Sequence, residues 1–344
     1  MMQADEYKDY EFVWVLKRNK KVKIPNAKII YYNSPQYFYY LSRSKFWVFN
    51  CKMPNHLIKK EEQVYLQTWH GTPLKKLAND INIGADKTFY RTQVTKAQMA
   101  ESYKNDSAKY DYFVSPNEFS TGKFESAFQV DARKMIETGY PRNDFVTNVT
   151  PEEIEALKVK YKIPTDKKVI LYAPTWRDNN FNSKGYVQEL KVDFNKWYEQ
   201  LGDEFVVIYK PHYLIVNKHI DKSLNKFLYS INENADINDL YVISDLLITD
   251  YSSVFFDYAN LNRPVMFYMY DVVEYGSEIR GFYLDIYEDL PGAIITEEDE
   301  LLSEIKNLDT YTQETKQKLD VFNERFNYLQ TGDCSKRVVD IMMK

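Results

Sequence analysis

Residues 205–212 have the sequence Phe205-Val206-Val207-Ile208-Tyr209-Lys210-Pro211-His212, in which an unbroken apolar run leads directly to a lysine, a proline and a histidine. A strand that has no polar position is buried on both faces, and such strands are typical of parallel sheets with helices on both sides. We therefore expect an α/β fold in which Lys210 and His212 leave the sheet at the carboxyl end of a buried strand.

Similar strand-like runs recur along the chain and alternate with amphipathic stretches of helical spacing. They form two series, the first at 11–16, 28–32, 45–49, 63–66 and 110–114, and the second at 168–172, 205–209, 246–248 and 264–268. Strands that alternate with helices predict βαβ units, and two such series predict two parallel-sheet domains.

The domain boundary is predicted near 143–151, because Thr150-Pro151-Glu152-Glu153 has the composition of a helix start with proline at the first helical position. We expect an N-terminal domain at 1–147, a C-terminal domain at 148–315, and C-terminal helices at 316–344 that pack back on the first domain. Helical spacing of apolar residues in the charged stretch from about residue 297 supports these last helices.

Composition narrows the class of protein. The chain has 344 residues, of which 44% are hydrophobic and 28% charged, and its net charge is -5, so we expect a soluble globular protein and no nucleic-acid binding. The two cysteines, Cys51 and Cys334, lie too far apart in sequence for a zinc motif and are too few for a disulfide framework. No signal peptide and no apolar run of about 18 residues is evident, so we expect a cytoplasmic location.

His70 lies in the segment Gln67-Thr68-Trp69-His70-Gly71-Thr72-Pro73-Leu74-Lys75, just after a strand run. Thr72-Pro73 predicts an N-cap and first turn of a helix through Leu77. An imidazole at this edge of a sheet can accept a proton from an attacking hydroxyl. The alternative is a histidine that only hydrogen-bonds the turn, and the segment alone leaves both open.

Lys210 and His212 can neutralise charge on a phosphate leaving group, or they can simply face water after Pro211 ends the strand. A third strand run ends in Thr249-Asp250-Tyr251-Ser252-Ser253, followed by a helical run at 254–259. Hydroxyls before a helix can form an anion site, and an ordinary N-cap is the alternative. Asp257, one turn further, can hold a ribose hydroxyl or support the first turn.

Two arginines complete the candidates. Arg177 ends the segment Ala173-Pro174-Thr175-Trp176-Arg177 after a strand run, and Arg280 precedes Gly281, which permits close approach of the backbone. A guanidinium can bind phosphate through two parallel hydrogen bonds, whereas an exposed surface arginine is the common alternative. No histidine or cysteine pair has metal-ligand spacing, so no metal site is predicted.

Taken together, these segments resemble one family, the CDP-glycerol glycerophosphotransferases that build wall teichoic acids and related capsular polymers in bacteria. The matching strings occur in the family's order over roughly residues 10–300, and they are Gln67 to Leu77, Gly139-Tyr140-Pro141-Arg142-Asn143-Asp144, Ala173 to Arg177, Lys210-Pro211-His212, Asp250 to Ser253 with Asp257, and Arg280-Gly281-Phe282-Tyr283.

The resemblance implies a GT-B-like arrangement, with two Rossmann-type domains facing each other across a cleft. It implies that His70 deprotonates the acceptor hydroxyl and that His212 stabilises the diphosphate. The candidates for phosphate contacts are Thr249, Ser252, Ser253, Arg177, Lys210 and Arg280, and Asp257 is the candidate for a supporting or ribose contact.

The implied reaction transfers glycerol phosphate, or ribitol phosphate, from a CDP-alditol to a polymer or lipid-linked acceptor and releases CMP, without a metal or further cofactor. Two alternatives are a GT-B glycosyltransferase that uses a nucleotide sugar and a non-catalytic partner of a polymer synthase.

The chain departs from the family in lacking a β-α unit before Phe12, so we expect a first domain that is short, completed by an upstream part of a larger polypeptide, or completed by a neighbouring subunit of an oligomer. The cluster Lys17-Arg18-Asn19-Lys20-Lys21-Val22-Lys23 predicts either a solvated loop or a peripheral contact with anionic membrane.

Overall fold

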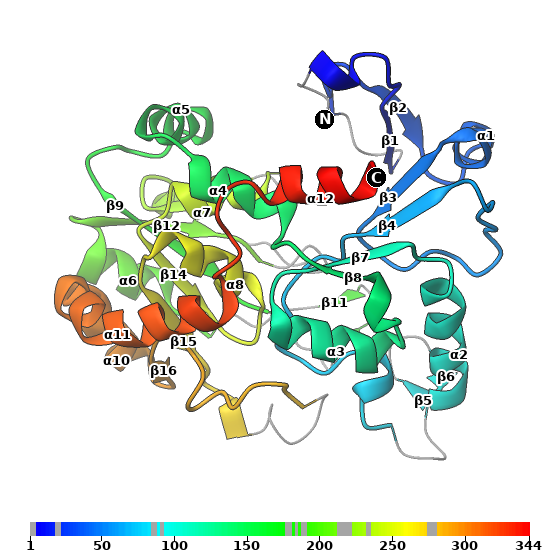
Figure 1. Ribbon diagram of the computed structural model, residues 1–344. Helices are drawn as coiled ribbons and strands as arrows, with labels where there is room; N and C mark the ends of the chain where they lie inside the picture. Colours follow the sequence, from blue (N-terminus) through cyan, green and yellow to red (C-terminus); the bar gives the residue numbers. More distant parts are fainter. Residues whose placement is uncertain are drawn as a thin grey trace.

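Two α/β lobes lie side by side in the computed structural model, as Figure 1 shows. The structure describes residues 5–17, 22–83, 88–89, 93–175, 181–182, 185–186, 191–211, 222–231, 235–273 and 281–344. Short 3-10 helices join several elements, at Asp5–Tyr7, Ala78–Asp80, Ala132–Lys134, Pro141–Asn143, Lys222–Leu224 and Ala259–Leu261.

The N-terminal lobe has a four-stranded parallel sheet in the order β3-β4-β7-β8 and a separate parallel pair, β1-β2. Its strands are β1 (Val13–Leu16), β2 (Lys28–Tyr31), β3 (Phe46–Phe49), β4 (Val64–Gln67), β7 (Tyr112–Ser115) and β8 (Met135–Glu137), with a small hairpin of β5 (Thr88–Phe89) and β6 (Val94–Thr95). Its helices are α1 (Pro35–Arg43), α2 (Lys96–Ser107) and α3 (Glu118–Phe128).

The C-terminal lobe has a six-stranded, all-parallel sheet in the order β13-β12-β9-β14-β15-β16. Its strands are β9 (Lys168–Ala173), β12 (Phe205–Tyr209), β13 (Leu228–Ser230), β14 (Leu246–Thr249), β15 (Val265–Tyr268) and β16 (Ile294–Ile295), and β10 (Phe181–Asn182) pairs with β11 (Gly185–Tyr186) in a separate hairpin. The helices of this lobe are α4 (Asp144–Asn148), α5 (Pro151–Tyr161), α6 (Phe194–Leu201), α7 (Ile237–Val242), α8 (Val254–Tyr258), α10 (Glu298–Lys306) and α11 (Leu308–Phe326), and α12 (Cys334–Met342) follows them in the chain.

Helices cover both faces of the C-terminal sheet, as the apolar composition of its strands predicts. Along β12, Val206 and Ile208 face a core that includes residues of α7, α8 and α11. Phe205, Val207 and Tyr209 face the other core, which includes residues of α6 and α10. Every residue of β12 is buried. Alternate side chains of one strand thus enter two different cores, which explains why no position in the strand is polar.

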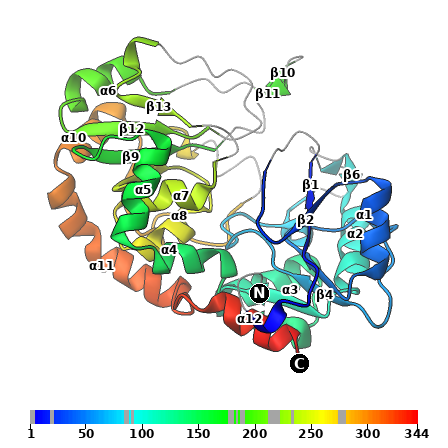
Figure 2. The same cartoon turned by 90° about the horizontal axis from the view of Figure 1, so that it is seen from above.

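The chain crosses between the lobes a second time through α11 and α12, which Figure 2 shows running along one side of the molecule. Val338 and Met342 of α12 pack with Leu66 and Val114 of the N-terminal sheet. Gly139 lies close against this crossing, because a Cβ atom there would meet Cys334 Sγ at 2.6 Å. The last helix therefore belongs to the core of the first lobe.

Most predicted elements are present, but one is wrong. The predicted strand runs coincide with β1, β2, β3, β4, β7, β9, β12, β14 and β15, and the helix start at Thr150 is confirmed by a capping box with Glu153. The helix predicted from Thr72 to Leu77 does not form. These residues are extended and pair with the C-terminal lobe, where Lys75 bridges Phe282 and Tyr283 N donates to Leu74 O at 2.8 Å. Tertiary pairing overrides the local Thr-Pro signal.

Candidate active site

The candidate residues of the C-terminal lobe follow three adjacent strands. In the order β12-β9-β14, all parallel, Tyr209 is level with Tyr172 and Ala173 is level with Thr249. Since the chain goes from β9 to one neighbour and later returns to the other, the strand order changes direction at β9. Open α/β sheets bind ligands in the crevice at the carboxyl ends of such strands.

Five of the predicted site residues of this lobe lie in the described part of the chain: Lys210, Thr249, Ser252, Ser253 and Asp257. The residues His212, Arg177 and Arg280 lie outside the described residues. Lys210 directly follows β12 and is partly buried, and its backbone N–H donates to Tyr172 O at 2.9 Å. Lys210 therefore lies at the carboxyl edge of the sheet, as predicted.

The ring of His70 is held in the N-terminal lobe by a contact with the Asn50 carbonyl and by stacking on Trp69. Its Nδ1 lies 2.6 Å from Asn50 O, and its ring stacks on Trp69 with centroids 4.1 Å apart. Because a carbonyl oxygen only accepts, Nδ1 carries the proton, and in the neutral ring Nε2 is then the basic nitrogen. Trp69 has a φ of 51°, a left-handed conformation that sets the direction of the ring after β4.

Gln67, the last residue of β4, fixes the two segments that hold His70. It is fully buried, its side-chain oxygen accepts from Trp69 N at 2.9 Å, and its side-chain nitrogen donates to Cys51 O at 3.0 Å. Cys51 follows Asn50, whose carbonyl binds the imidazole. One buried amide thus connects the loop that carries His70 with the loop that orients its ring.

The pKa of His70 is lowered from its usual value of 6.5. Desolvation by the surrounding protein is the main cause, although part of the residue is exposed at the surface. The hydrogen bond to Asn50 acts in the opposite direction, and the positive charge of Arg142 lowers the pKa further. His70 is therefore mostly neutral at pH 7, as a general base must be.

The loop that carries His70 directly contacts the loop of Ser252 and Ser253 in the other lobe, which we call the serine loop. A Cβ atom on Gly71 would lie 3.1 Å from Ser253 Oγ, so the glycine allows close approach of the two loops. Beside this contact, Lys76 N donates to Gly281 O at 3.0 Å. The predicted base and one predicted phosphate ligand, 183 residues apart in sequence, are thus brought together.

Arg142 and Asn143 are the residues at this interface to which the sequence assigned no role. Arg142 Nη1 donates to His70 O at 2.6 Å, and its Nη2 donates to both carboxylate oxygens of Asp257, at 2.8 and 2.6 Å. Asn143 Nδ2 donates to the same carboxylate at 2.9 Å. Both residues lie in the string Gly139 to Asp144, which was a signal, but nothing in sequence linked it to Asp257.

Two expectations for single residues change with this geometry. Thr249 is fully buried and its hydroxyl donates to Ala173 O at 2.8 Å, so it ties β14 to β9, and this geometry does not support a phosphate contact. Asp257 is buried and its carboxylate binds Arg142 and Asn143, which favours the supporting role over a ribose contact, and both stay predictions. Ser252 and Ser253 are partly buried, and their role as hydroxyl donors to phosphate stays a prediction.

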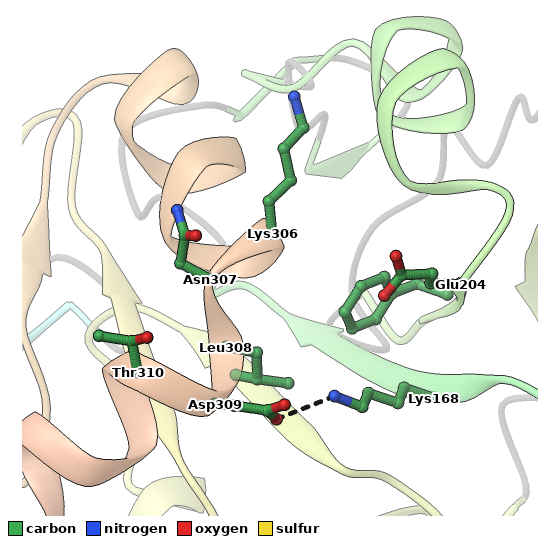
Figure 3. Close-up of a pocket in the computed structure, with 8 residues that line it drawn as sticks. Lys168, Glu204, Lys306, Asn307, Leu308, Asp309 and Thr310 are labelled. Carbon is green, nitrogen blue, oxygen red and sulfur yellow. Dashed lines mark hydrogen bonds and ion pairs between the residues drawn. The ribbon is translucent and has the colours of Figure 1, made fainter.

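A separate pocket opens at the opposite edge of the C-terminal sheet. It is lined by Lys168 and Phe205, the first residues of β9 and β12, and by the turn between α10 and α11, where Lys168 and Asp309 form an ion pair at 3.0 Å (Figure 3). In a parallel sheet the amino and carboxyl ends lie on opposite edges. This pocket is therefore not part of the candidate site.

The described ranges contain neither a cluster of metal-ligand side chains nor a membrane-spanning helix. Among them no three histidine, cysteine or acidic side chains are grouped as metal ligands would be, and the absence of a metal in the reaction stays a prediction. Within the same ranges no helix has the length and apolar character needed to cross a bilayer.

Comparisons with known proteins agree with this architecture. A family profile described as CDP-Glycerol:Poly(glycerophosphate) glycerophosphotransferase matches residues 1–344. The teichoic acid poly(glycerol phosphate) polymerase of Staphylococcus epidermidis is 41% identical over 342 residues, which is 98% of this chain and 47% of that protein. Its namesake from Bacillus spizizenii is 39% identical over 344 residues, which is 98% of this chain and 85% of that protein.

A solved structure of the wall teichoic acid polymerase TagF matches with a TM-score of 0.91 at 40% identity, covering 98% of this chain and 82% of that chain. This match confirms the predicted GT-B-like fold. The chain spans about half the length of the staphylococcal relative, 47% of it. By the profile match over its whole length, the chain belongs to the CDP-glycerol:poly(glycerophosphate) glycerophosphotransferase family.

Proposed function

We propose that this protein transfers glycerol phosphate from CDP-glycerol to a terminal hydroxyl of a teichoic-acid-like polymer and releases CMP. The observation that carries the proposal is the contact between the loop of a neutral, oriented His70 and the loop of Ser252 and Ser253, one from each lobe. A base and a phosphate seat at the same interface are what a hydroxyl attack on phosphorus requires.

In the reaction, the acceptor oxygen forms a bond to the phosphorus that carries glycerol, and the bond from this phosphorus to the CMP oxygen breaks. The acceptor proton passes to Nε2 of His70, while Nδ1–H stays hydrogen-bonded to Asn50 O. The imidazolium that forms is positioned without further rearrangement, because both the ring and its supporting carbonyl are already in place.

On the donor side, the charge that develops on the departing CMP needs cationic and hydroxyl partners. We assign this role to Lys210, Ser252 and Ser253 and, beyond the described residues, to His212, Arg177 and Arg280. In phosphoryl transfer the protein needs to do little covalent chemistry itself. Positioning of the reactants and stabilisation of charge therefore supply most of the acceleration. These groups can supply both without a metal.

The test is a donor screen with a synthetic lipid-linked or oligomeric glycerol phosphate acceptor. Protein and acceptor are incubated separately with CDP-glycerol, CDP-ribitol and UDP-sugars. Nucleotide release is measured, and the mass of the acceptor is determined by mass spectrometry. We expect CMP release from CDP-glycerol and products longer by whole glycerol phosphate units. Release of UDP with a sugar added to the acceptor would instead establish the glycosyltransferase alternative, and no release with any donor would favour a non-catalytic partner.

We also propose that the protein works at the cytoplasmic face of a membrane through a peripheral contact of the N-terminal lobe. Trp14 and Tyr31 are exposed on the β1-β2 pair, which runs into the basic cluster that begins at Lys17. Aromatic and basic side chains together favour anionic interfaces. Cosedimentation with anionic but not with neutral vesicles, reduced by Trp14→Ala, is the expected result, and equal recovery from both vesicle types would reject this contact.

A further inference from the structure

One arginine connects the base to the donor lobe. The guanidinium of Arg142 binds the backbone carbonyl of His70 through Nη1 at 2.6 Å and the carboxylate of Asp257 through Nη2 at 2.6 and 2.8 Å. Asp257 lies on α8, directly after Ser252 and Ser253. The planar guanidinium of Arg142 therefore connects His70, the proposed proton acceptor, to α8, the helix that follows Ser252 and Ser253.

The surroundings of Arg142 keep this group in one position. Its guanidinium carbon lies 4.8 Å from the ring centroid of Tyr140, and its backbone carbonyl accepts from Asn238 Nδ2 of α7 at 3.1 Å. Asn143 shares the carboxylate of Asp257. Only 9% of the Asp257 side chain is exposed, so solvent screens this pair much less than it screens an ion pair at the surface.

We propose that Arg142 is a positioning residue that sets the distance between His70 and the phosphate held at Ser252 and Ser253. This inference rests on the proposed function and names a residue through which it works. A guanidinium offers several N–H donors in a fixed plane, so it can bind a carbonyl and a carboxylate in two directions at once. A lysine ammonium keeps the charge but cannot reproduce this fixed geometry.

The first test compares Arg142→Lys with Arg133→Lys, a matched control. Arg133 is also paired with an aspartate, Asp131, but on the exposed surface of the N-terminal lobe. Because a misplacement of about 1 Å can cost on the order of 100-fold in rate, we expect Arg142→Lys to lower kcat by about 10- to 100-fold. The KM for CDP-glycerol should change by less than about threefold, since the donor ligands remain. Arg133→Lys should behave as the unmodified protein does.

A second readout does not depend on turnover. Arg142 is the charged group that lowers the pKa of His70 within the described part of the chain, and Asp257 is bound to its other terminal nitrogen. Arg142→Gln removes the positive charge and leaves the carboxylate uncompensated, so the pKa of His70 should rise, whereas Arg142→Lys should shift it less. The imidazole signal is followed by NMR against pH and assigned by its absence in His70→Gln.

The outcomes separate the inference from the function on which it rests. If the unmodified protein releases no CMP, the proposed function fails, while the NMR shift still tests the contact. If the unmodified protein is active and Arg142→Lys has the same kcat, or loses kcat only together with donor affinity, the positioning role is wrong. Should Arg142→Lys fail to fold, Asp257→Asn decides, because it keeps the arginine. A lower kcat in Asp257→Asn supports the positioning role of Arg142, and an unchanged kcat overturns it.

Discussion

The two lobes of this protein differ in how completely their strands are buried. In the C-terminal lobe every residue of β12, β14 and β15 is buried, whereas β2 and β3 of the N-terminal lobe each bury a single residue. The C-terminal sheet is a closed layer between helices. In the four-stranded N-terminal sheet the edge strands β3 and β8 are open, whereas β4 and β7 between them each bury three residues, and part of the covering comes from α12.

This difference in burial parallels a difference in the candidate site residues that the two lobes carry. The closed C-terminal sheet presents a row of loops at neighbouring strand ends, and these carry the candidate donor ligands. The N-terminal lobe contributes one imidazole, held by a backbone carbonyl and a buried glutamine. Changes in the first lobe should therefore affect mainly kcat, and changes in the serine loop should affect mainly donor binding.

The largest expected effect tests this division at its centre. His70→Ala removes the proposed base, and general-base catalysis typically contributes about 100- to 10,000-fold, so kcat should fall by that amount. CDP-glycerol binding, measured by calorimetry, should change little. Ser252→Ala is the counterpart on the donor side and should weaken CDP-glycerol binding with a smaller loss of kcat. Full turnover in the His70 variant would show that another group takes the proton.

A second pair of variants tests the difference in burial. Ile208 of β12 is fully buried, and truncating a large aliphatic residue in a core costs about 2–5 kcal/mol, so Ile208→Ala should lower the unfolding midpoint markedly. Val48 of β3 is 56% exposed, and Val48→Ala should cost less than about 0.5 kcal/mol. Thermal and urea unfolding followed by circular dichroism provide the comparison. Equal losses would mean that something else covers the N-terminal sheet in solution.

A third variant tests how the first lobe orients its base. Gln67→Met keeps the length of the side chain but leaves Trp69 N–H and Cys51 C=O without this partner. A buried polar group that loses its partner costs about 1–3 kcal/mol. We expect a stability loss in that range and a fall in kcat of about tenfold, because the orientation of His70 is released. A stability loss at unchanged kcat would make Gln67 purely structural.

The smallest expected effect is in the pH profile. A base must be neutral to accept a proton, and burial together with Arg142 lowers the pKa of His70. As the pH falls, the imidazole stays neutral until the pH reaches its lowered pKa, so the acidic limb of kcat/KM should lie below pH 6.5, the usual value for histidine. An acidic limb above this value would contradict the environment described for His70.

The sequence predicted the C-terminal lobe better than the contacts between the lobes, and for a physical reason. Strands such as 205–209 are apolar throughout because both faces are buried, so composition alone identifies them. The short strands β8, β13 and β16 have two or three residues each, too few for any periodicity, and were not predicted. The false helix at 72–77 arose because its pairing partners, 281–283, are about 200 residues away.

The same limit applies to the site. His70, Lys210 and the serine loop were predicted as site residues because each follows a strand, which is a local signal. Arg142 was not assigned, because its role depends on Asp257, 115 residues later in the chain. Thr249 was assigned a ligand role because a hydroxyl looks the same in sequence whether it faces a cleft or bonds a neighbouring strand.

The position of α12 also has a consequence for how the chain is made. Leu66, Val114 and Tyr140 find their apolar partners in Val338 and Met342, close to the last residue. While the polypeptide emerges from the ribosome, this surface of the N-terminal lobe stays uncovered until α12 has been translated. Slow translation, or a nascent chain stalled before Val338, would leave these apolar side chains as a target for chaperones.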